Sequence, residues 1–165
     1  GTRDAWNSLV MSKGCSKEAK ALFGDKASSE CTKIREDGYA VEAGENDTLI
    51  VQKLASNPDA YGFFGYSYLV GNKDKVKAAA IEGVKPSLEG IQDYSYPIAR
   101  PLFFYVKKAH IGVVPGIDAF IKDFTSKKAM GPRGYLAEIG LVPLAKAKYD
   151  VVRTAAVELN TISIK

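Results

Sequence analysis

The sequence predicts an α/β protein in which helices pack on mixed sheets, and three observations support this prediction. Apolar residues recur at helical spacing in several windows, most clearly over residues 116–128. Continuous apolar runs, such as residues 102–106 (LFFYV), suit strands that are covered on both faces. The two patterns alternate along the chain, with Gly, Pro and Asn residues between them. The 165 residues are 46% hydrophobic and 25% charged, which is the composition of a globular protein that buries a core.

Six helices are predicted from apolar periodicity and from residues that favour helix ends. The first begins at the start of the sequence, where Ala5, Trp6, Leu9 and Val10 lie at helical spacing. Residues 44–47 (GEND) provide a turn and an N-cap for the third helix, and a Gly-Pro pair at residues 131–132 ends the fourth. The predicted ranges are 2–11, 17–23, 46–55, 116–128, 134–139 and 149–159.

Two of these helices have predicted buried faces. The helix at 46–55 is expected to bury Leu49, Ile50 and Leu54. In the helix at 116–128, one apolar face is formed by Ile117, Phe120, Ile121 and Phe124.

Four strands are predicted, at residues 37–43, 61–66, 76–81 and 100–107. The glycines of the second would let another backbone approach closely. Its neighbourhood carries five aromatic residues that could stack on bases or sugars, but a buried strand followed by a helix start explains them better. These are Tyr61, Phe63, Phe64, Tyr66 and Tyr68. Residues 94–101, with two prolines, suit a crossover or hinge.

Charge and hydropathy argue against nucleic-acid and membrane-spanning classes. The net charge of +4 comes from 23 basic and 19 acidic residues scattered without long like-charge blocks. A nucleic-acid protein usually carries a clustered basic stripe. No stretch approaches the roughly 18 consecutive apolar residues of a membrane span.

The two cysteines, Cys15 and Cys31, lie 16 positions apart among polar residues. They are either buried free thiols of a cytosolic protein or a disulfide of a protein in an oxidising compartment. Their polar neighbours are unlike those of core cysteines and favour the disulfide, which would stabilise the fold by about 3 kcal/mol in the chain-entropy model. A metal site is not expected, because no CxxC spacing occurs and His110 is the single histidine.

The sequence lacks the motifs that enzymes of common classes carry. No GxSxG, HExxH, Walker A or complete GxGxxG sequence occurs, and residues 62–65 (GFFG) are a poor dinucleotide fingerprint. His110, beside two lysines, is better explained as a surface or capping residue than as a catalytic base. We therefore predict that the chain is not an enzyme.

The opening residues Gly1, Thr2, Arg3 and Asp4 form a candidate anion site. A helix that starts here would present unpaired N–H groups, a small Gly, a Thr hydroxyl and a guanidinium within one turn. Asp4 could orient the guanidinium or accept a proton from a protonated phosphate. The alternative is an ordinary helix start with a surface arginine, and the residue chemistry alone leaves both open.

The same residues resemble a known motif. Residues 1–6, Gly-Thr-Arg-Asp-Ala-Trp, resemble the Ser-Gly-Thr-Arg-Asp-Ala-Phe motif of periplasmic phosphate-binding proteins, the substrate-binding components of the high-affinity phosphate ABC transporter. Residues 44–65 resemble the helix, Asn-Pro turn and glycine-flanked strand of that family, and residues 100–130 resemble its return strand and late helix. The resemblance covers nearly the whole chain in matching order.

The resemblance implies a type II periplasmic-binding-protein-like fold, with two α/β lobes and an anion in the cleft between them. This chain would be an incomplete C-terminal portion. Residues 1–98 would form most of the second lobe, starting at the anion-binding helix N-terminus, and residues 99–165 would be a return segment completing the first lobe. An N-terminal segment of the same protein is then an expected partner, and phosphate binding without it is expected to be weak.

By the same resemblance, Gly1 and Thr2 donate to phosphate oxygens, and Arg3 and Asp4 lie in or beside the site. The implied function is to bind inorganic phosphate in the periplasm, or elsewhere outside the cytoplasm, and to deliver it to ABC transporter membrane subunits. No cofactor, metal, nucleic acid or membrane insertion is expected. The alternatives are a receptor for another oxyanion or small solute, an enzyme on the same scaffold, and a non-transport surface or adhesion protein.

Overall fold

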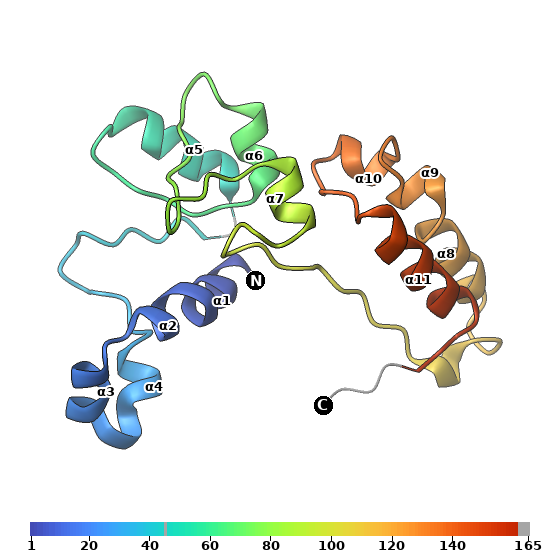
Figure 1. The fold of residues 1–165 in the computed structure, drawn as a ribbon, viewed down its shortest axis with the longest axis horizontal. Helices are drawn as coiled ribbons and strands as arrows, with labels where there is room; N and C mark the ends of the chain where they lie inside the picture. The colour runs from blue at the N-terminus through green and yellow to red at the C-terminus, as the bar shows by residue number, and fades with distance from the viewer. Residues whose placement is uncertain (45, 162–165) are drawn as a thin grey trace. The chain divides into compact units, whose positions relative to one another are not determined.

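The structure is a computed structural model that describes residues 1–44 and 46–161. The chain divides into two compact units, Gly1–Ala79 and Ala80–Lys165. Each unit is built from short helices joined by extended segments (Figure 1). The predicted division into parts of two lobes at residues 98 and 99 remains a prediction.

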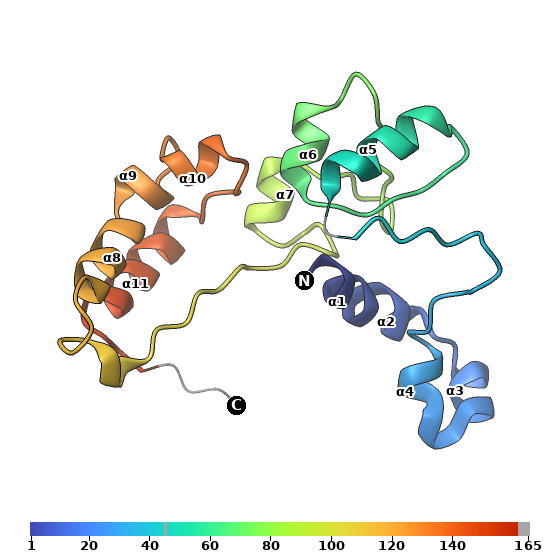
Figure 2. The same ribbon diagram turned by 180° about the vertical axis from the view of Figure 1, so that it is seen from behind.

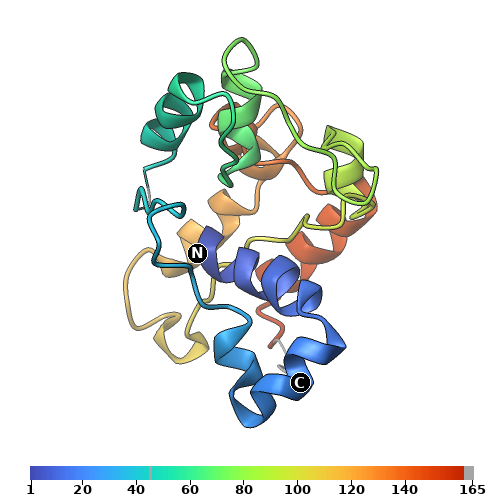
Figure 3. The same ribbon diagram turned by 90° about the vertical axis from the view of Figure 1, so that its left-hand side faces the viewer.

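The first unit opens with a continuous helical run over residues 2–14. It consists of α1 (Thr2–Trp6), the π-helical turn η1 (Asn7–Met11) and α2 (Ser12–Gly14), seen as the blue run from the N-terminus in Figure 3. The predicted helix at 2–11 is therefore confirmed and extends three residues further. The Trp6 ring stacks on Phe63 with centroids 4.5 Å apart, so the apolar side of α1 packs against the coil that follows α5 (Asp47–Ser56).

A disulfide-closed helical hairpin follows. It comprises α3 (Lys17–Phe23), η2 (Gly24–Lys26) and α4 (Ala27–Glu30), and Figure 2 shows α3 and α4 side by side. Ser16 caps α3, because its hydroxyl accepts the Ala19 N–H at 3.1 Å. The structure joins Cys15 to Cys31, with Cα atoms 5.7 Å apart, which confirms the predicted disulfide.

The rest of the first unit contains α5 and α6 (Tyr66–Gly71). Of residues 44–47, which were predicted to supply a turn and an N-cap, Asn46 is the N-cap of α5, and its side chain accepts the Leu49 N–H at 3.0 Å. The predicted buried face of this helix was wrong in part. Val51 is 3% exposed, whereas the side chain of Leu49 is exposed and Ile50 and Leu54 are half-buried. The reason is that α6 and the residues after it cover the Val51 side of the helix.

The second unit begins with α7 (Leu88–Gln92), which the sequence did not predict, and continues with η3 (Lys108–His110). Its other helices are α8 (Ile117–Phe124), α9 (Lys127–Met130), α10 (Tyr135–Glu138) and α11 (Lys146–Val157). The buried centre lies where α8, α9 and α11 meet, at Ile121, Thr125, Ala129 and Tyr149.

The predicted helix at 116–128 is two helices. Thr125 ends α8, and Ser126 begins a new one by accepting the Ala129 N–H at 3.2 Å. The carbonyl of Thr125 instead accepts the Tyr149 hydroxyl at 2.9 Å, which ties the end of α8 to α11. On the predicted apolar face, Ile121 is buried but the Phe120 side chain is exposed. The predicted helix at 134–139 is confirmed as α10, and the last helix begins three residues before the predicted Tyr149.

The predicted sheets are not present in the described part of the chain. Residues 37–43, 61–65, 76–80 and 100–107 are irregular or extended, and an isolated bridge between Ile81 and Val84 is the strand-like pairing there. The reason is that extended backbone becomes a strand only when a neighbour accepts and donates its hydrogen bonds, and these segments have no such neighbour in the described chain. The burial predicted for 61–66 was wrong, since residues 61–63 are exposed, with Tyr61 92% exposed, and residues 64–66 are half-buried.

None of the helices in the described residues combines the length and apolar character that crossing a membrane requires.

Candidate functional site

The candidate site is the first turn of α1. The first backbone hydrogen bond of this helix runs from the Ala5 N–H to the Gly1 carbonyl at 3.1 Å. The N–H groups of Thr2 and Arg3 therefore come before the first hydrogen bond of the helix backbone, and they lie at the positive end of the helix dipole. Gly1, Thr2, Arg3 and Asp4 are all exposed, so a solute can reach this turn. The structure keeps the four predicted residues together in one exposed turn.

Arg3 forms an ion pair with Glu42. Its Nη1 donates to the Glu42 Oε1, and the two side chains are 54% and 62% exposed. Glu42 lies in the irregular segment before α5, 39 positions along the chain. Sequence reasoning missed it, and no signal pointed to it, because a single Glu in a coil has no spacing relation to the helix start. An exposed pair of this kind stabilises by about 0–1 kcal/mol, so an anion can displace it.

Asp4 lies at the third position of α1 and accepts a hydrogen bond from the Gly1 nitrogen at 2.5 Å. A carboxylate in the first turn is favoured by the helix dipole. The positive end of α1 thus already carries one carboxylate beside the exposed amides. Any bound anion must share this end with Asp4 and with Glu42, whose charges are opposed by the groups that they pair with, the Gly1 nitrogen and Arg3. This charge balance favours an anion that can carry a proton toward a carboxylate.

The position of the turn is set by Trp6, three residues after Arg3. Its stacking on Phe63 holds the first helix against the coil that follows α5. Gly62, beside Phe63, lies close to α5, because a Cβ there would be 3.0 Å from Leu54 Cδ1. The glycine thus lets this coil run along α5, which connects the candidate site to the packed part of the first unit.

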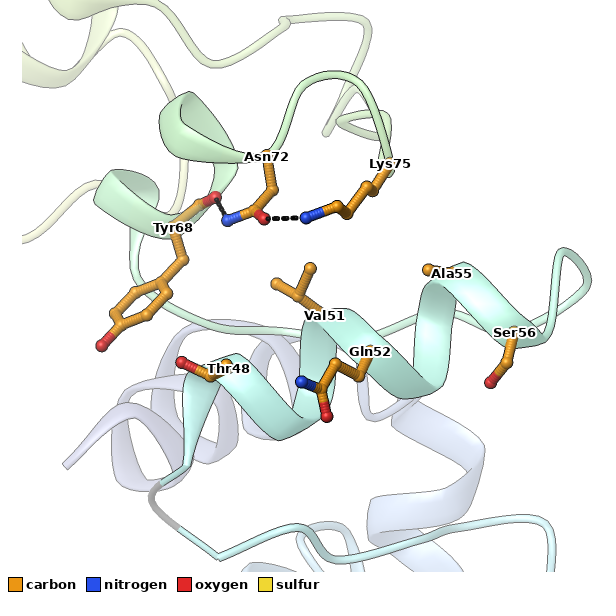
Figure 4. Close-up of a pocket in the computed structure, with 8 residues that line it drawn as sticks. All are labelled: Thr48, Val51, Gln52, Ala55, Ser56, Tyr68, Asn72 and Lys75. Atoms are coloured by element: carbon orange, nitrogen blue, oxygen red, sulfur yellow. Dashed lines mark hydrogen bonds between the residues drawn. The ribbon is translucent and has the colours of Figure 1, made fainter.

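A separate groove lies between α5 and α6, with a volume of about 470 Å³ (Figure 4). Val51 forms its apolar base, and the Lys75 ammonium donates to the Asn72 side-chain oxygen at 3.4 Å. The Asn72 amide in turn donates to the Tyr68 carbonyl at 2.9 Å. None of the residues predicted from the sequence as site residues lines this groove.

The other candidate groups play no part in a shared site within the described residues. His110 ends the short helix η3 on the surface of the second unit. The described side chains include no cluster of three or more His, Cys, Asp or Glu residues that could hold a metal ion. The five aromatic residues of 61–68 do not form a platform, since Tyr61 points into solvent while Phe63 packs on Trp6.

Comparison with known proteins identifies the family. Residues 1–128 match the family model described as a PBP superfamily domain. Over 155 residues the chain is 32% identical to Protein SphX of Synechococcus elongatus. This alignment covers 90% of this chain and 38% of that protein. It is also 32% identical over 111 residues to the Phosphate-binding protein PstS of Staphylococcus aureus (strain USA300), covering 63% of this chain and 34% of that protein. No solved structure gives a significant match.

The chain spans little more than a third of the length of these curated relatives. PstS is described as a binding protein, in agreement with the prediction that this chain is not an enzyme. The matched region begins at Gly1 and includes the first turn of α1, the disulfide hairpin and α5 to α8. The chain therefore belongs to the PBP superfamily and is a distant relative of phosphate-binding proteins.

Proposed function

We propose that this chain contributes one side of a binding site for inorganic phosphate, at the first turn of α1, in a receptor that delivers phosphate to an ABC transporter. The observation that carries the proposal is the exposed helix start with Thr2 and Arg3, placed at the beginning of the family match. The relative named a phosphate-binding protein supports phosphate as the ligand. The ligand would lie in a cleft between two lobes.

The first turn supplies the donors that a tetrahedral oxyanion needs. The amides of Thr2 and Arg3 precede the helical ladder, and the Thr2 hydroxyl is a further donor. The Arg3 guanidinium has five N–H donors, of which the structure commits one to Glu42. The remaining N–H groups of the guanidinium can then donate two parallel hydrogen bonds to a pair of phosphate oxygens. The carboxylate of Asp4 would accept the proton of a protonated phosphate.

Glu42 competes with phosphate for Arg3 in this proposal. In the structure, its carboxylate occupies one donor of the guanidinium that phosphate would use. The two carboxylates near Arg3 also repel a doubly charged anion. Replacing Glu42 by Gln therefore removes both a competitor and a repulsive charge, and is expected to tighten phosphate binding a few-fold.

The disulfide supports a location outside the cytoplasm. Disulfides persist in secreted, periplasmic and cell-surface proteins and are rare in the cytosol. The Cys15–Cys31 bond is therefore consistent with a receptor that meets its ligand outside the cytoplasm. Membrane subunits of a phosphate transporter are the proposed partners.

Isothermal titration calorimetry tests the proposal. The protein as purified, stripped of phosphate, is titrated with inorganic phosphate, and intact-mass analysis shows whether another polypeptide accompanies the chain. The Arg3→Gln variant is expected to weaken binding about tenfold or more, because a hydrogen bond to a charged group contributes about 1.5–3 kcal/mol. Lys13→Gln is the matched control, since Lys13 is an exposed cation at the far end of the same helical run.

The outcomes separate the alternatives. Saturable phosphate binding that is weakened by Arg3→Gln and unchanged by Lys13→Gln supports the proposal. Equal effects of the two variants would show that only net charge matters and would reject the site. Sulfate binding without phosphate binding would indicate a receptor for another oxyanion. Hydrolysis of a phosphate ester would indicate an enzyme, and absence of any anion binding would favour a surface or adhesion role.

A further inference from the structure

The sequence contains a single Asp-Gly pair, Asp37 and Gly38, and no Asn-Gly pair. In an Asp-Gly pair the main-chain nitrogen of the glycine can attack the side-chain carboxyl carbon of the aspartate, because the glycine has no Cβ to hinder the approach. Every other aspartate of the chain precedes a residue that has a side chain. Attack of the backbone on an aspartate therefore meets the least steric resistance at Asp37.

The backbone around this pair is irregular. Residues 35–40 are exposed and lie outside any helix. Gly38 has a φ of 89°, in the region that favours glycine. No backbone group of residues 34–43 forms a hydrogen bond to the backbone of another described residue. The Gly38 nitrogen is thus not held in a ladder of backbone hydrogen bonds, and the segment can rotate to bring it to the Asp37 carboxyl group.

Arg35 holds the Asp37 carboxylate by both of its oxygens. The Arg35 Nε donates to Oδ1 at 2.7 Å, and the Nη2 donates to Oδ2. The Tyr39 N–H also donates to Oδ1, at 3.4 Å. The guanidinium carbon lies 4.7 Å from the centre of the Tyr39 ring, so a cation–π contact helps to position it. All of these contacts lie within residues 35–39, so they depend only on this short segment.

A carboxylate held in this way is a poor electrophile. Attack by the nitrogen must expel a carboxyl oxygen, and only the protonated carboxyl group can release it as water. The hydrogen bonds from Arg35 lower the pKa of Asp37 and so favour the ionised form. Among the described residues, Arg35 is the charged group that acts on this pKa, and Tyr39 contributes its backbone N–H. The two parallel hydrogen bonds also fix the plane of the carboxylate.

We propose that Asp37 is a site of isoaspartate formation and that Arg35 restrains this reaction. The Gly38 nitrogen bonds to the Asp37 Cγ, and the carboxyl hydroxyl and the amide proton leave together as water, which gives a succinimide. Water then opens the ring. Cleavage of the bond from the nitrogen to Cγ restores aspartate, and cleavage of the bond to the α-carbonyl carbon gives isoaspartate. The main chain then runs through the Asp37 side chain, and the free carboxyl group lies on Cα.

Ageing of the purified 165-residue chain at mildly acidic pH tests the proposal. Samples are digested with trypsin at intervals, and the two forms of the peptide that contains Asp37 are separated by liquid chromatography. Electron-transfer fragmentation then identifies isoaspartate, because the two forms have the same mass. Asp59 is the internal control, since it is an exposed aspartate of the same unit that precedes Ala60. Isoaspartate is expected to accumulate at Asp37 faster than at Asp59.

Arg35→Gln is expected to speed the accumulation about two- to fivefold, because an exposed ion pair contributes little free energy. Lys33→Gln is the matched control, since it removes the same charge from an exposed position two residues earlier. The pH dependence gives a second readout. In Arg35→Gln the carboxyl group stays protonated to a higher pH, so the fall of the rate with rising pH is expected at a higher pH than in the unaltered chain.

Three results would overturn the proposal. The first is an absence of isoaspartate at Asp37 in both the unaltered chain and Arg35→Gln, or accumulation that is no faster than at Asp59. The second is an equal rate in the unaltered chain and Arg35→Gln, or an equal acceleration by Lys33→Gln. The third is an acceleration in Arg35→Gln with an unchanged pH dependence, which would show a general loosening of the segment and no restraint through the carboxylate.

Discussion

The hydrogen bond between Tyr149 and Thr125 makes a quantitative prediction about how the second unit is held together. The Tyr149 hydroxyl donates to the Thr125 carbonyl at 2.9 Å. Tyr149 is 6% exposed and Thr125 is fully buried. In Tyr149→Phe the ring still fills its space, but the carbonyl at the end of α8 is left buried without this donor. An orphaned buried polar group costs about 1–3 kcal/mol.

The assay is urea unfolding followed by far-ultraviolet circular dichroism. The single tryptophan lies in the first unit, so tryptophan fluorescence would not report on this bond. For a unit of this size, each kcal/mol corresponds to a change of about 4–8 °C in the melting temperature. In Tyr149→Phe, the loss of this hydrogen bond is expected to lower the free energy of unfolding by about 1–3 kcal/mol, with an unchanged slope of that free energy against urea concentration.

Tyr135→Phe is the matched control. Its hydroxyl donates to Asp123 at 3.3 Å on the exposed surface of the same unit, where water replaces the lost bond. This control is expected to change the free energy of unfolding by about 0.5 kcal/mol or less. If the two variants lose the same stability, burial of the Thr125 carbonyl does not determine the effect and the reasoning is refuted.

Three further predictions follow from the same structure. Replacing both cysteines of the Cys15–Cys31 disulfide by serine should lower the free energy of unfolding of the first unit by about 3 kcal/mol, read by tryptophan fluorescence in urea; an unchanged midpoint would contradict it. Gly131→Ala should lower the melting temperature, because the new Cβ would lie 2.2 Å from a backbone carbonyl oxygen of α9; calorimetry that shows no loss would exclude the clash. The hydrogen bonds from Arg35 lower the pKa of Asp37, so this pair stabilises the fold above about pH 4 and the contribution is lost as the pH falls through the lowered pKa. Carboxyl NMR titration should show the Asp37 pKa rising toward its ordinary value in Arg35→Gln, and no rise would remove the guanidinium as the cause.

The helices were largely predictable because their signals are local. The Asn46 cap of α5 and the Ser16 cap of α3 are single polar residues directly before apolar helical patterns. The break after α8 was not predictable in the same way. It depends on Tyr149, 24 positions away, whose hydroxyl donates a hydrogen bond to the Thr125 carbonyl. No glycine or proline occurs at the break, and the first such pair is residues 131–132, so the sequence pattern indicated one long helix.

The predicted strands illustrate the opposite case. The apolar run at 102–106 has the composition of a buried strand, and the backbone there is extended. Composition cannot supply the neighbour that a strand must pair with, and the described chain provides none for this segment. The same limit applied to burial, since Val51 rather than Leu49 faces the interior of the first unit.

The candidate site was predictable only as far as its residues are consecutive. Gly1 to Asp4 lie together because they form one turn of α1, whatever else the chain does. The ion pair of Arg3 with Glu42 could not be predicted, because it depends on the path of an irregular segment. Whether this turn binds phosphate remains a prediction for the calorimetric test.

The disulfide hairpin also changes what proteolysis would reveal. Three exposed lysines on short helices lie between the two bonded cysteines, namely Lys17, Lys20 and Lys26. A single tryptic cut at any of them leaves both products joined by the Cys15–Cys31 bond. The nicked molecule would run intact on a non-reducing gel, would be heavier by one water in a mass spectrum, and would separate into two fragments only after reduction.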